Sequence, residues 1–408
     1  MSAEKRRGIA LVVNTLSGGG AERAVSNLSL RFSERYDVDI VVNDDAHLDY
    51  PYAGNIISLK LPADADRMGA AYQIRALIKR TYVLRRLKRE RDYAAVISFS
   101  EMTNAANVLS GNRNTRTIAT VHNSPGVRGE SDTVQRLFGR LILPYLCKKA
   151  DRTVSCSREI EDELIRHFGL ERAKSAVIYN GLELRRIRDM STEPLLPEEE
   201  KDFAGEKVIV SVGRLTYQKG HRHLLKAVKY LRDEGLAVRL IILGEGELRP
   251  KLEAQIRSSG LAECVALPGF VENPYRYMAR ADVVVMPSVY EGFSNVLIEA
   301  LACGAPVVST DHRTGAREIL APDTDYRLKV ADRIEEAAFG ILTPVCREEN
   351  GDEPGAVSAG EILMADAIRR VLTDKELERR YRQAAIRRAE QIDIAAVCLM
   401  WERLIGEN

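Results

Sequence analysis

Two glutamates separated by seven residues, Glu291 and Glu299, are the most specific chemical feature of this 408-residue sequence. They lie in the segment Tyr290–Thr310, whose pattern predicts a loop, a helix and then a strand. A carboxylate can accept two hydrogen bonds, which suits the vicinal hydroxyls of a ribose or a hexose. Two surface glutamates around an amphipathic helix are the alternative interpretation. The pair predicts a sugar site if both glutamates face one ligand.

The start of the same helix predicts an anion site. Ser294 or Asn295 is suited to cap the helix, and the backbone amides of its first turn, helped by the helix dipole, can bind a negative charge. Gly292 and the turn Gly304–Pro306 fall within the same short window. This combination favours a ligand site over a plain surface helix.

A second group of residues suits a diphosphate. The segment Val208–Gly220 predicts a buried strand that ends at Gly213, followed by Arg214 and Lys219. The glycine would let a ligand approach the backbone, while the guanidinium offers a planar fork and the ammonium a point charge. Taken alone, two basic residues on a loop are more often simply solvated.

A glycine-rich loop and a histidine follow other predicted strands. Ser17–Arg23 places Gly19 and Gly20 at the start of a helix, where amides can meet a phosphate or a sugar, although a plain tight turn is equally compatible. The missing G-x-G-x-x-G pattern disfavours a nicotinamide oxidoreductase. His122 follows the strand Thr117–Val121, where α/β proteins build their sites, and a structural histidine is the alternative.

Metal sites are not indicated by the sequence. Two D-x-D triplets, Asp64–Asp66 and Asp323–Asp325, could hold a metal–diphosphate complex, but neither follows a convincing buried strand and both lie in loops that contain proline. We therefore expect no metal and no cofactor. The six cysteines form no C-x-x-C pair, which argues against zinc and thioredoxin-type sites and fits a reducing cytoplasm.

The segment Arg75–Arg91 predicts a strongly basic amphipathic helix, with eight Lys and Arg residues against one Glu. Apolar residues within it and directly before it recur at near-helical spacing: Ile74, Leu77, Ile78, Leu84 and Leu87. Such a helix can lie on an anionic membrane surface, and a helix that covers a sheet with a solvated basic face is equally compatible. Nucleic acid is a poorer partner, because no aromatic interleaving accompanies the charge.

A scaffold for these residues is predicted by short apolar runs that alternate with helical patterns. The first series of predicted strands is Ile9–Val13, Val38–Val42, Ala95–Phe99, Thr117–Val121 and Arg152–Ser155. The second series is Val208–Val212, Arg239–Leu243, Val265–Leu267, Val283–Pro287 and Pro306–Ser309. This alternation predicts an α/β protein of two doubly wound, Rossmann-like domains, with parallel sheets and a site in a central cleft between the domains.

Two further segments carry expectations about organisation. Ser191–Gly205 is acidic, holds two prolines and is predicted as a linker or a surface loop near the domain boundary. Glu376–Arg403 is rich in Arg, Ala and Glu and is predicted as a helical segment packed on the outside.

Charge is unevenly distributed, although the formal net charge is +1. Residues 1–180 carry 28 Lys and Arg against 21 Asp and Glu, and the remainder carries 32 against 38, which suggests two domains with different partners. No apolar run approaches the roughly 18 residues of a membrane span. We expect a cytoplasmic protein that is at most peripheral on the inner face of the plasma membrane.

Together these motifs resemble those of family 4 retaining glycosyltransferases of the GT-B fold. Glu291–Glu299 matches the family's E-x7-E motif, Arg214 and Lys219 match its diphosphate-binding pair, and Gly19–Gly20 match its N-terminal glycine loop. His122 matches a histidine that lies near the transferred sugar. The resemblance covers nearly the whole chain.

The resemblance also implies domains and a subset of the family. Residues 1–185 would form an acceptor-side domain, residues 186–387 a nucleotide-sugar-binding domain, and residues 388–408 a helix that crosses back to the first domain. The segment Thr314–Leu320 departs from the family pattern at Ala316–Arg317. This departure resembles enzymes that build cell-surface polysaccharides or lipid-linked oligosaccharides.

The roles that the resemblance implies involve no metal. Arg214, Lys219 and the helix amides would stabilise the departing nucleotide diphosphate. Glu299 would hold the ribose, while Glu291 and His122 would contact the donor sugar. The implied catalytic residues are His122, Arg214, Lys219 and Glu291. The implied donor-binding residues are Gly19, Gly20, Gly213, Phe270, Val271, Gly292, Phe293, Ser294, Asn295, Val296, Leu297 and Glu299.

We therefore expect a retaining enzyme that moves a hexose or an N-acetylhexosamine from a nucleotide-sugar, UDP-linked by preference, to a saccharide or polyprenyl-linked acceptor in cell-surface glycan synthesis. Another GT-B enzyme, such as a nucleotide-sugar epimerase, and a non-catalytic sugar-nucleotide-binding subunit are the alternatives.

Overall fold

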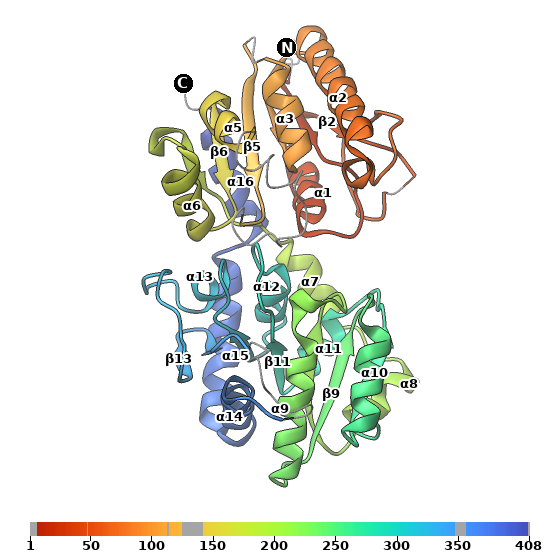
Figure 1. Cartoon of the computed structure of the whole chain (residues 1–408), viewed down its shortest axis with the longest axis vertical. Coiled ribbons are helices and arrows are strands. Elements are labelled where there is room, and N and C mark those ends of the chain that lie inside the picture. Colours follow the sequence, from red (N-terminus) through yellow and green to blue (C-terminus); the bar gives the residue numbers. More distant parts are fainter. Residues whose placement is uncertain (1–5, 47, 112–113, 125–141, 347–355, 407–408) are drawn as a thin grey trace. The chain divides into compact units, whose positions relative to one another are not determined.

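A computed structural model describes residues 6–46, 48–111, 114–124, 142–346 and 356–406. The chain forms two compact units, the first made of Met1–Leu182 with Ile392–Asn408 and the second of Glu183–Gln391. Each contains a seven-stranded sheet with helices packed on it (Figure 1). The predicted α/β class with two doubly wound, Rossmann-like sheets is confirmed. We expected the unit boundaries after residues 185 and 387, and the chain changes unit after residues 182 and 391.

The first unit has a parallel sheet of strand order β3-β2-β1-β4-β5-β6-β7. Its strands are β1 (Gly8–Val12), β2 (Asp37–Val42), β3 (Asn55–Ser58), β4 (Tyr93–Ser98), β5 (Arg116–Val121), β6 (Arg152–Ser155) and β7 (Ser175–Val177). Its helices are α1 (Gly20–Phe32), α2 (Ala70–Glu90), α3 (Glu101–Leu109), α5 (Leu143–Lys149), α6 (Arg158–Phe168) and α16 (Ile394–Gly406).

Alternating side chains of β1 explain why this sheet is covered on both faces. Ile9 and Leu11 pack with residues of α1 and α16, whereas Ala10 and Val12 pack with residues of α2. Successive residues of a strand point to opposite faces, so a strand that is apolar throughout needs helices on both sides. The last helix of the chain therefore supplies part of the first unit's core, with Trp401 4% exposed.

The second unit has strand order β10-β9-β8-β11-β12-β14-β13, and only β13 of these strands runs antiparallel to its neighbour. Its strands are β8 (Lys207–Val212), β9 (Val238–Leu243), β10 (Val265–Gly269), β11 (Val283–Met286), β12 (Val307–Thr310), β13 (Glu335–Ala337) and β14 (Gly340–Thr343). Its helices are α7 (Leu184–Ser191), α8 (Pro197–Glu200), α9 (His221–Asp233), α10 (Arg249–Ser258), α11 (Tyr275–Arg280), α12 (Asn295–Ala302), α13 (Ala316–Leu320), α14 (Ala359–Thr373) and α15 (Lys375–Glu390).

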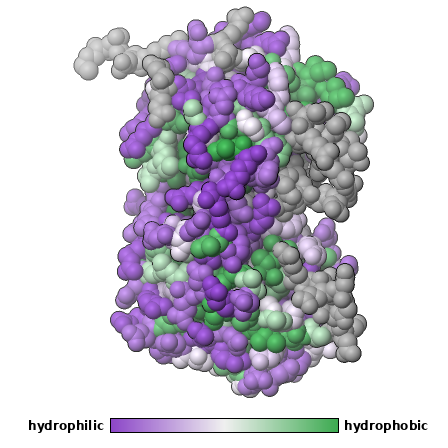
Figure 2. Space-filling view, turned by 60° about the vertical axis from the view of Figure 1, so that its left-hand side comes forward, coloured by the Kyte–Doolittle hydropathy of each residue, from purple (hydrophilic) through white to green (hydrophobic). Residues whose placement is uncertain are grey.

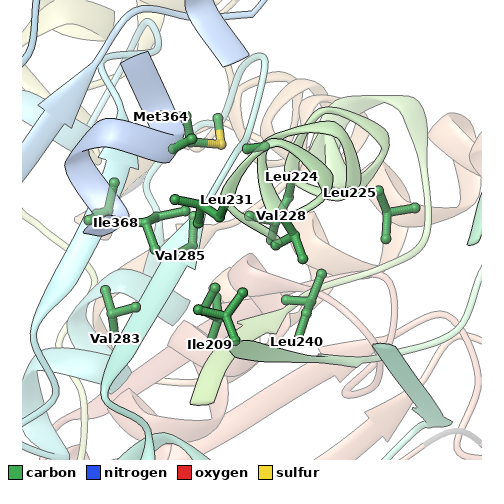
Figure 3. Close-up of a cluster of buried hydrophobic side chains, with 14 of the residues drawn as sticks. Ile209, Leu224, Leu225, Val228, Leu231, Leu240, Val283, Val285, Met364 and Ile368 are labelled. Carbon is green, nitrogen blue, oxygen red and sulfur yellow. The ribbon is translucent and has the colours of Figure 1, made fainter. Parts of the chain in front are cut away.

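A large core cluster of the second unit lies between the sheet and several helices, α9 and α14 among them. Leucines and a valine of α9 meet Ile209 of β8 and Leu240 of β9, and Met364 and Ile368 of α14 complete the cluster (Figure 3). Burial of each such side chain contributes about 2 kcal/mol. This packing holds the carboxyl ends of β8 and β11 in place, where the predicted site residues follow.

Two predictions about organisation are only partly right. Of the two possibilities for Ser191–Gly205, the linker is excluded, because the segment lies inside the second unit and is tied to it by the ion pairs Glu199–Arg276 (2.6 Å) and Asp202–Arg239 (2.8 Å). The segment is mostly exposed, as expected of a surface loop near the boundary. Glu376–Arg403 is divided between α15 and α16, and neither helix packs merely on the outside. Buried residues on α15, including Tyr381, join the core of the second unit.

The sequence also missed four strands: β3, β7, β13 and β14. Each has four residues or fewer, and β3, β7 and β13 are edge strands of their sheets. Edge strands are half exposed, so they need no continuous apolar run and leave a weak sequence pattern.

Among the described residues, no helix is both long and apolar enough to cross a membrane. On the face drawn in Figure 2, hydrophobic residues form small separate patches among hydrophilic ones.

Candidate active site

A buried ion pair joins the two motifs that the sequence predicted for the second unit. The Lys219 Nζ donates to Glu291 Oε1 at 2.5 Å, and these side chains are 14% and 8% exposed. Lys219 comes from the loop after β8, and Glu291 from the loop after β11. Because β8 and β11 are neighbours in a parallel sheet, their carboxyl ends bring the two loops to one edge.

Two more donors hold the Glu291 carboxylate. Ser288 Oγ donates to Oε1 at 2.8 Å, and Gln218 Nε2 donates to Oε2 at 3.1 Å. Burial by itself would raise the pKa of Glu291, but the charges of Lys219 and His312 and the hydrogen bonds from Lys219 and Ser288 outweigh it and lower the pKa below its usual value. Glu291 is therefore ionised at neutral pH. Three donors leave its carboxylate room for about one more hydrogen bond.

Glycines let the loops after β8 and β11 pack this closely. The Lys219 side chain lies across Gly213, where an added Cβ would sit 3.2 Å from its Cδ. Gly220 has φ 66°, and a Cβ there would overlap the Pro287 carbonyl oxygen. We expected Gly213 to let a ligand approach the backbone, and in this structure the group that approaches it is the Lys219 stem. Because Gly213 has no Cβ, it leaves the space that the Lys219 side chain occupies.

The start of α12 is held by the loop after β12. Ser294 Oγ lies 3.3 Å from His312 Nε2, and the Thr314 hydroxyl donates to the Glu291 backbone carbonyl. Thr314 has φ 65°, a strained conformation for a β-branched residue, and this bond to Glu291 helps to hold it. Gly315 packs against Phe293, with an added Cβ 3.3 Å from its Cα. The loop after β12 therefore holds the Glu291–Phe293 backbone in place.

The amides at this helix start are less open than predicted. Ser294 precedes the helix but its side chain makes no capping bond. The Asn295 amide donates to the Phe293 carbonyl at 3.0 Å, and the Leu297 amide donates to the Ser294 carbonyl at 3.1 Å. Val296, between them, is half-buried. An anion here would have to share these donors or rely on the helix dipole.

Glu299 lies within α12, 8% exposed, with Tyr275 of α11 as a neighbour; the Tyr275 hydroxyl is 3.5 Å from Glu299 Oε1. Arg214 is exposed in the loop after β8. Phe270 is 80% exposed directly after β10, and Val271 beside it is half-buried. An exposed aromatic ring at a strand end is an open apolar surface of the kind that a planar base can cover.

The first unit carries the remaining predicted residues. Gly19 precedes α1 and Gly20 is its first residue, but an added Cβ on Gly19 would overlap the Glu22 carboxyl. A carboxylate at this position opposes a phosphate and favours a hydroxyl-bearing ligand.

His122 follows β5 and lines a cavity within the first unit. The cavity is also lined by Phe99, Thr120, Val154, Cys156, Tyr179, Asn180 and Trp401. The imidazole stacks on Phe99, with ring centroids 5.6 Å apart, and its Nε2 lies 2.9 Å from the Thr120 hydroxyl. Burial lowers its pKa to about 4, so the ring is neutral at pH 7. Within the described part of the chain, Nδ1 is buried without a hydrogen-bond partner.

The first D-x-D triplet has a structural partner. Asp66 Oδ1 accepts from the fully buried Arg80 at 2.7 Å, and Arg80 also donates to Asn43 Oδ1 at 2.9 Å. The described residues contain no group of three or more His, Cys, Asp or Glu placed to hold a metal ion.

Sequence reasoning missed Gln218, Ser288, Tyr275 and Thr314. Ser288 lies just after β11, so its place at a strand end is a signal that could have identified it. Tyr275 and Thr314 offer no such signal, because their contacts with Glu299 and Glu291 depend on which loops the sheet brings together.

Family models and full-length relatives match this chain. A model described as "Glycosyltransferase Family 4" matches residues 18–186, and one described as "Glycosyl transferases group 1" matches residues 206–343. An uncharacterized glycosyltransferase of Methanocaldococcus jannaschii is 30% identical over 81% of this chain and 83% of its own length. A second relative, from Campylobacter jejuni, is 28% identical over 94% of this chain and 95% of its own. Its name is N-acetylgalactosamine-N,N'-diacetylbacillosaminyl-diphospho-undecaprenol 4-alpha-N-acetylgalactosaminyltransferase.

Solved structures share the fold. HepE of Anabaena in complex with UDP and glucose superposes with a TM-score of 0.74 at 18% identity, over 98% of this chain and 100% of that chain. WaaG, a glycosyltransferase involved in lipopolysaccharide biosynthesis, superposes with a TM-score of 0.68 at 16% identity, over 98% and 100%. With its two Rossmann-like sheets and both family matches, this chain belongs to the family 4 glycosyltransferases and has the GT-B fold.

Proposed function

We propose that this glycosyltransferase moves a hexose or an N-acetylhexosamine from a UDP-sugar to a saccharide carried on a polyprenyl diphosphate, with retention of configuration and without a metal ion. The observation that carries the proposal is the Lys219–Glu291 pair at the end of β8 and β11. It is supported by the Campylobacter relative, which matches 94% of this chain and whose name describes a sugar acceptor linked to undecaprenol through a diphosphate.

The donor diphosphate would bind beside Lys219. Its ammonium has three hydrogens and donates one to Glu291, so it retains donors for a second anion. Glu291 holds the ammonium in position, and exposed Arg214 supplies a second positive charge from the same loop. As the bond to the sugar breaks, negative charge grows on the leaving diphosphate, and cations already in place stabilise it. Lys219 and Arg214 would neutralise the charge of the leaving diphosphate, a role that a metal ion has in other enzymes.

The two ends of the donor would contact different residues. Glu299 suits the ribose, because a carboxylate accepts from both vicinal hydroxyls, and Phe270 with Val271 suits the base. Glu291 has capacity for about one hydroxyl of the donor sugar, and backbone at Gly292–Phe293 would add to it. Neutral His122 can donate or accept a hydrogen bond at the sugar but carries no charge that would repel a developing cation there.

An assay of transfer tests the proposal. The enzyme is incubated with UDP-N-acetylgalactosamine, UDP-N-acetylglucosamine, UDP-glucose or UDP-galactose and an undecaprenyl-diphosphate-linked saccharide, with a chelator present, and the product is analysed for its anomeric configuration. We expect an α-linked product from one α-linked donor. Lys219→Ala should lower kcat/KM at least about 100-fold, as loss of a group that stabilises a developing anion does.

The control is Lys229→Ala, which removes an exposed lysine of α9 paired with Asp233. It should leave transfer unchanged. Wild-type activity that disappears with the chelator, or full activity in Lys219→Ala, would overturn the proposal. Formation of an epimerised UDP-sugar without an acceptor would identify an epimerase instead.

A further inference from the structure

The Thr120 hydroxyl links His122 to the sheet of the first unit. Thr120 lies in β5, two residues before His122, and its Oγ1 is 2.9 Å from His122 Nε2. The same Oγ1 donates to the backbone carbonyl of Ser98 in β4 at 2.8 Å. A hydroxyl has one hydrogen, and a carbonyl oxygen can only accept, so the Thr120 hydrogen is used on Ser98. Toward the imidazole, Thr120 therefore acts as the acceptor.

This direction fixes the tautomer of His122. Because Thr120 accepts, Nε2 must carry a hydrogen and donate it. A neutral imidazole has one N–H, so its other nitrogen, Nδ1, keeps a bare lone pair. A charged ring would place a second N–H at Nδ1, which is buried and has no hydrogen-bond partner among the described residues. Burial of the ring, which lowers the pKa of His122, disfavours that form as well.

Buried amides of α3 hold Thr120 itself in place. Asn104 Nδ2 donates to the Thr120 carbonyl at 2.8 Å, and Asn104 Oδ1 accepts from the Thr120 amide at 3.3 Å. The Ser98 side-chain hydroxyl donates to Asn104 Oδ1 at 2.7 Å and accepts from Asn107 Nδ2 at 3.1 Å. These four residues are buried and need no ligand for their hydrogen bonds. The tautomer is therefore set in the free enzyme.

Aromatic packing fixes the plane of the His122 ring. Phe99 stacks on the imidazole with an interplanar angle of 24°, and Trp401 of α16 lies beside Phe99 with ring centroids 6.5 Å apart. A flip of the imidazole would break its bond to Thr120. Nδ1 is therefore the nitrogen that the ring can offer to a ligand, and a bare lone pair takes a hydrogen bond only from a donor.

We propose that Thr120 is a positioning residue for glycosyl transfer: it holds His122 as the Nε2–H tautomer, so that Nδ1 accepts a hydrogen bond from a hydroxyl of the donor sugar. The inference rests on the proposed function, in which His122 contacts that sugar, and deepens it. Neither ring nitrogen has a hydrogen for the leaving diphosphate, so stabilising that charge is left to Lys219 and Arg214. The partial negative charge of Nδ1 instead suits the positive charge that develops on the sugar.

Nitrogen-15 NMR of the imidazole tests the tautomer without any substrate. Couplings to the carbon-bound ring hydrogens distinguish a protonated ring nitrogen from a bare one, and His122→Gln assigns the signals. We expect wild type at pH 7 to hold the Nε2–H form alone. In Thr120→Val the Nε2–H loses its acceptor, and both tautomers should appear. Thr120→Ser keeps the hydroxyl and should keep the wild-type form.

Kinetics and UDP binding separate positioning from folding. Thr120→Val should lower kcat/KM for transfer about tenfold, as the loss of a group that orients a functional histidine does. Its affinity for UDP in calorimetry should equal that of the wild type, because UDP lacks the transferred sugar. Thr120→Ser should retain wild-type transfer.

Thr153→Val is the matched control. It makes the same substitution in the neighbouring strand β6, where Thr153 Oγ1 is buried and makes no hydrogen bond to the described residues. It should transfer like wild type and leave the His122 signals unchanged.

Three results would overturn the inference: an Nδ1–H tautomer in the wild type, wild-type ring signals in Thr120→Val, or full transfer by Thr120→Val when its tautomer has changed. The first of these needs no variant and decides the inference even if Thr120→Val does not fold. Wild type that holds the Nε2–H form but transfers no sugar from any UDP-sugar would refute the proposed function and leave the tautomer assignment standing.

Discussion

The buried pair of Lys219 and Glu291 allows a sharp prediction for Lys219→Met. The substitution keeps the apolar stem and removes the charge, so the ionised Glu291 stays buried with only Ser288 and Gln218 as hydrogen-bond donors. Removing one partner of a buried ion pair costs about 3 kcal/mol or more. We expect a loss of about 3 kcal/mol in the free energy of unfolding of the second unit at pH 7. Lys219→Met/Glu291→Gln should regain most of it, because a neutral amide needs no counter-charge.

The pH dependence of this loss follows from the pKa of Glu291. In the wild type that pKa lies below 4.5, so the carboxylate contributes stability above pH 4.5 and the contribution is lost as the pH falls through the folded value. Without Lys219, burial dominates and the folded pKa rises above 4.5. The variant then gains stability on acidification relative to the wild type. The difference between the two proteins should therefore shrink as the pH falls from 7 toward about 4.5.

Urea unfolding followed by far-UV circular dichroism measures the effect. Trp401, the single tryptophan, lies in the core of the first unit, so its fluorescence reports that unit and should not change. Lys229→Met is the control, because its pair with Asp233 is exposed and should cost about 0.5 kcal/mol or less. A loss for Lys219→Met no larger than that of the control, or one that is independent of pH, would refute the reasoning.

Three other perturbations test separate parts of the structure. Burial lowers the pKa of His122 to about 4, so its imidazole NMR signals, assigned with His122→Gln, should not titrate between about pH 8 and 5.5. The stability that the neutral ring contributes above pH 6.5 should be lost as the pH falls toward about 4. A titration midpoint near pH 6.5 would contradict this. Gly213→Ala places a Cβ 3.2 Å from Lys219 Cδ and should weaken UDP binding in calorimetry by about 1 kcal/mol, with little change in melting temperature; unchanged affinity would show that the lysine position is not critical. Arg80→Met removes the ion-pair partner of Asp66 and leaves Asn14 as its hydrogen-bond donor. It should cost the first unit about 3 kcal/mol in urea unfolding followed by Trp401 fluorescence, with no rescue by magnesium; rescue would indicate that the D-x-D triplet can bind a metal.

Most of the fold follows from local pattern. Strands such as β1 and β8 are buried on both faces, so their sequences are largely apolar and stand out between helical segments. β13, with the sequence Glu-Glu-Ala, pairs only with β14 at the sheet edge and carries no such pattern. Its position depends on pairing with β14, and strand pairing is decided by the tertiary structure.

The site divides in the same way. Gly213, Lys219 and His122 are predicted because each follows a strand, and the carboxyl ends of parallel strands meet at one edge. Glu291 is predicted from its spacing to Glu299 at the start of a helix. That Lys219 binds Glu291, 72 residues away in sequence, follows from the neighbouring positions of β8 and β11. The occupied amides of Asn295 and Leu297 likewise depend on the loop conformation rather than on residue type.

The basic helix shows the division most clearly. Its charge and its apolar residues are fixed by composition, and the sequence alone predicts an amphipathic helix. Which residues face the sheet is decided by packing: Leu84 and Arg80 are buried, whereas Ile78 and Tyr82 are exposed. Periodicity identifies faces but not what lies against them, because two apolar faces of one helix have the same repeat. Only the tertiary structure, by covering one face with the sheet, leaves the other exposed.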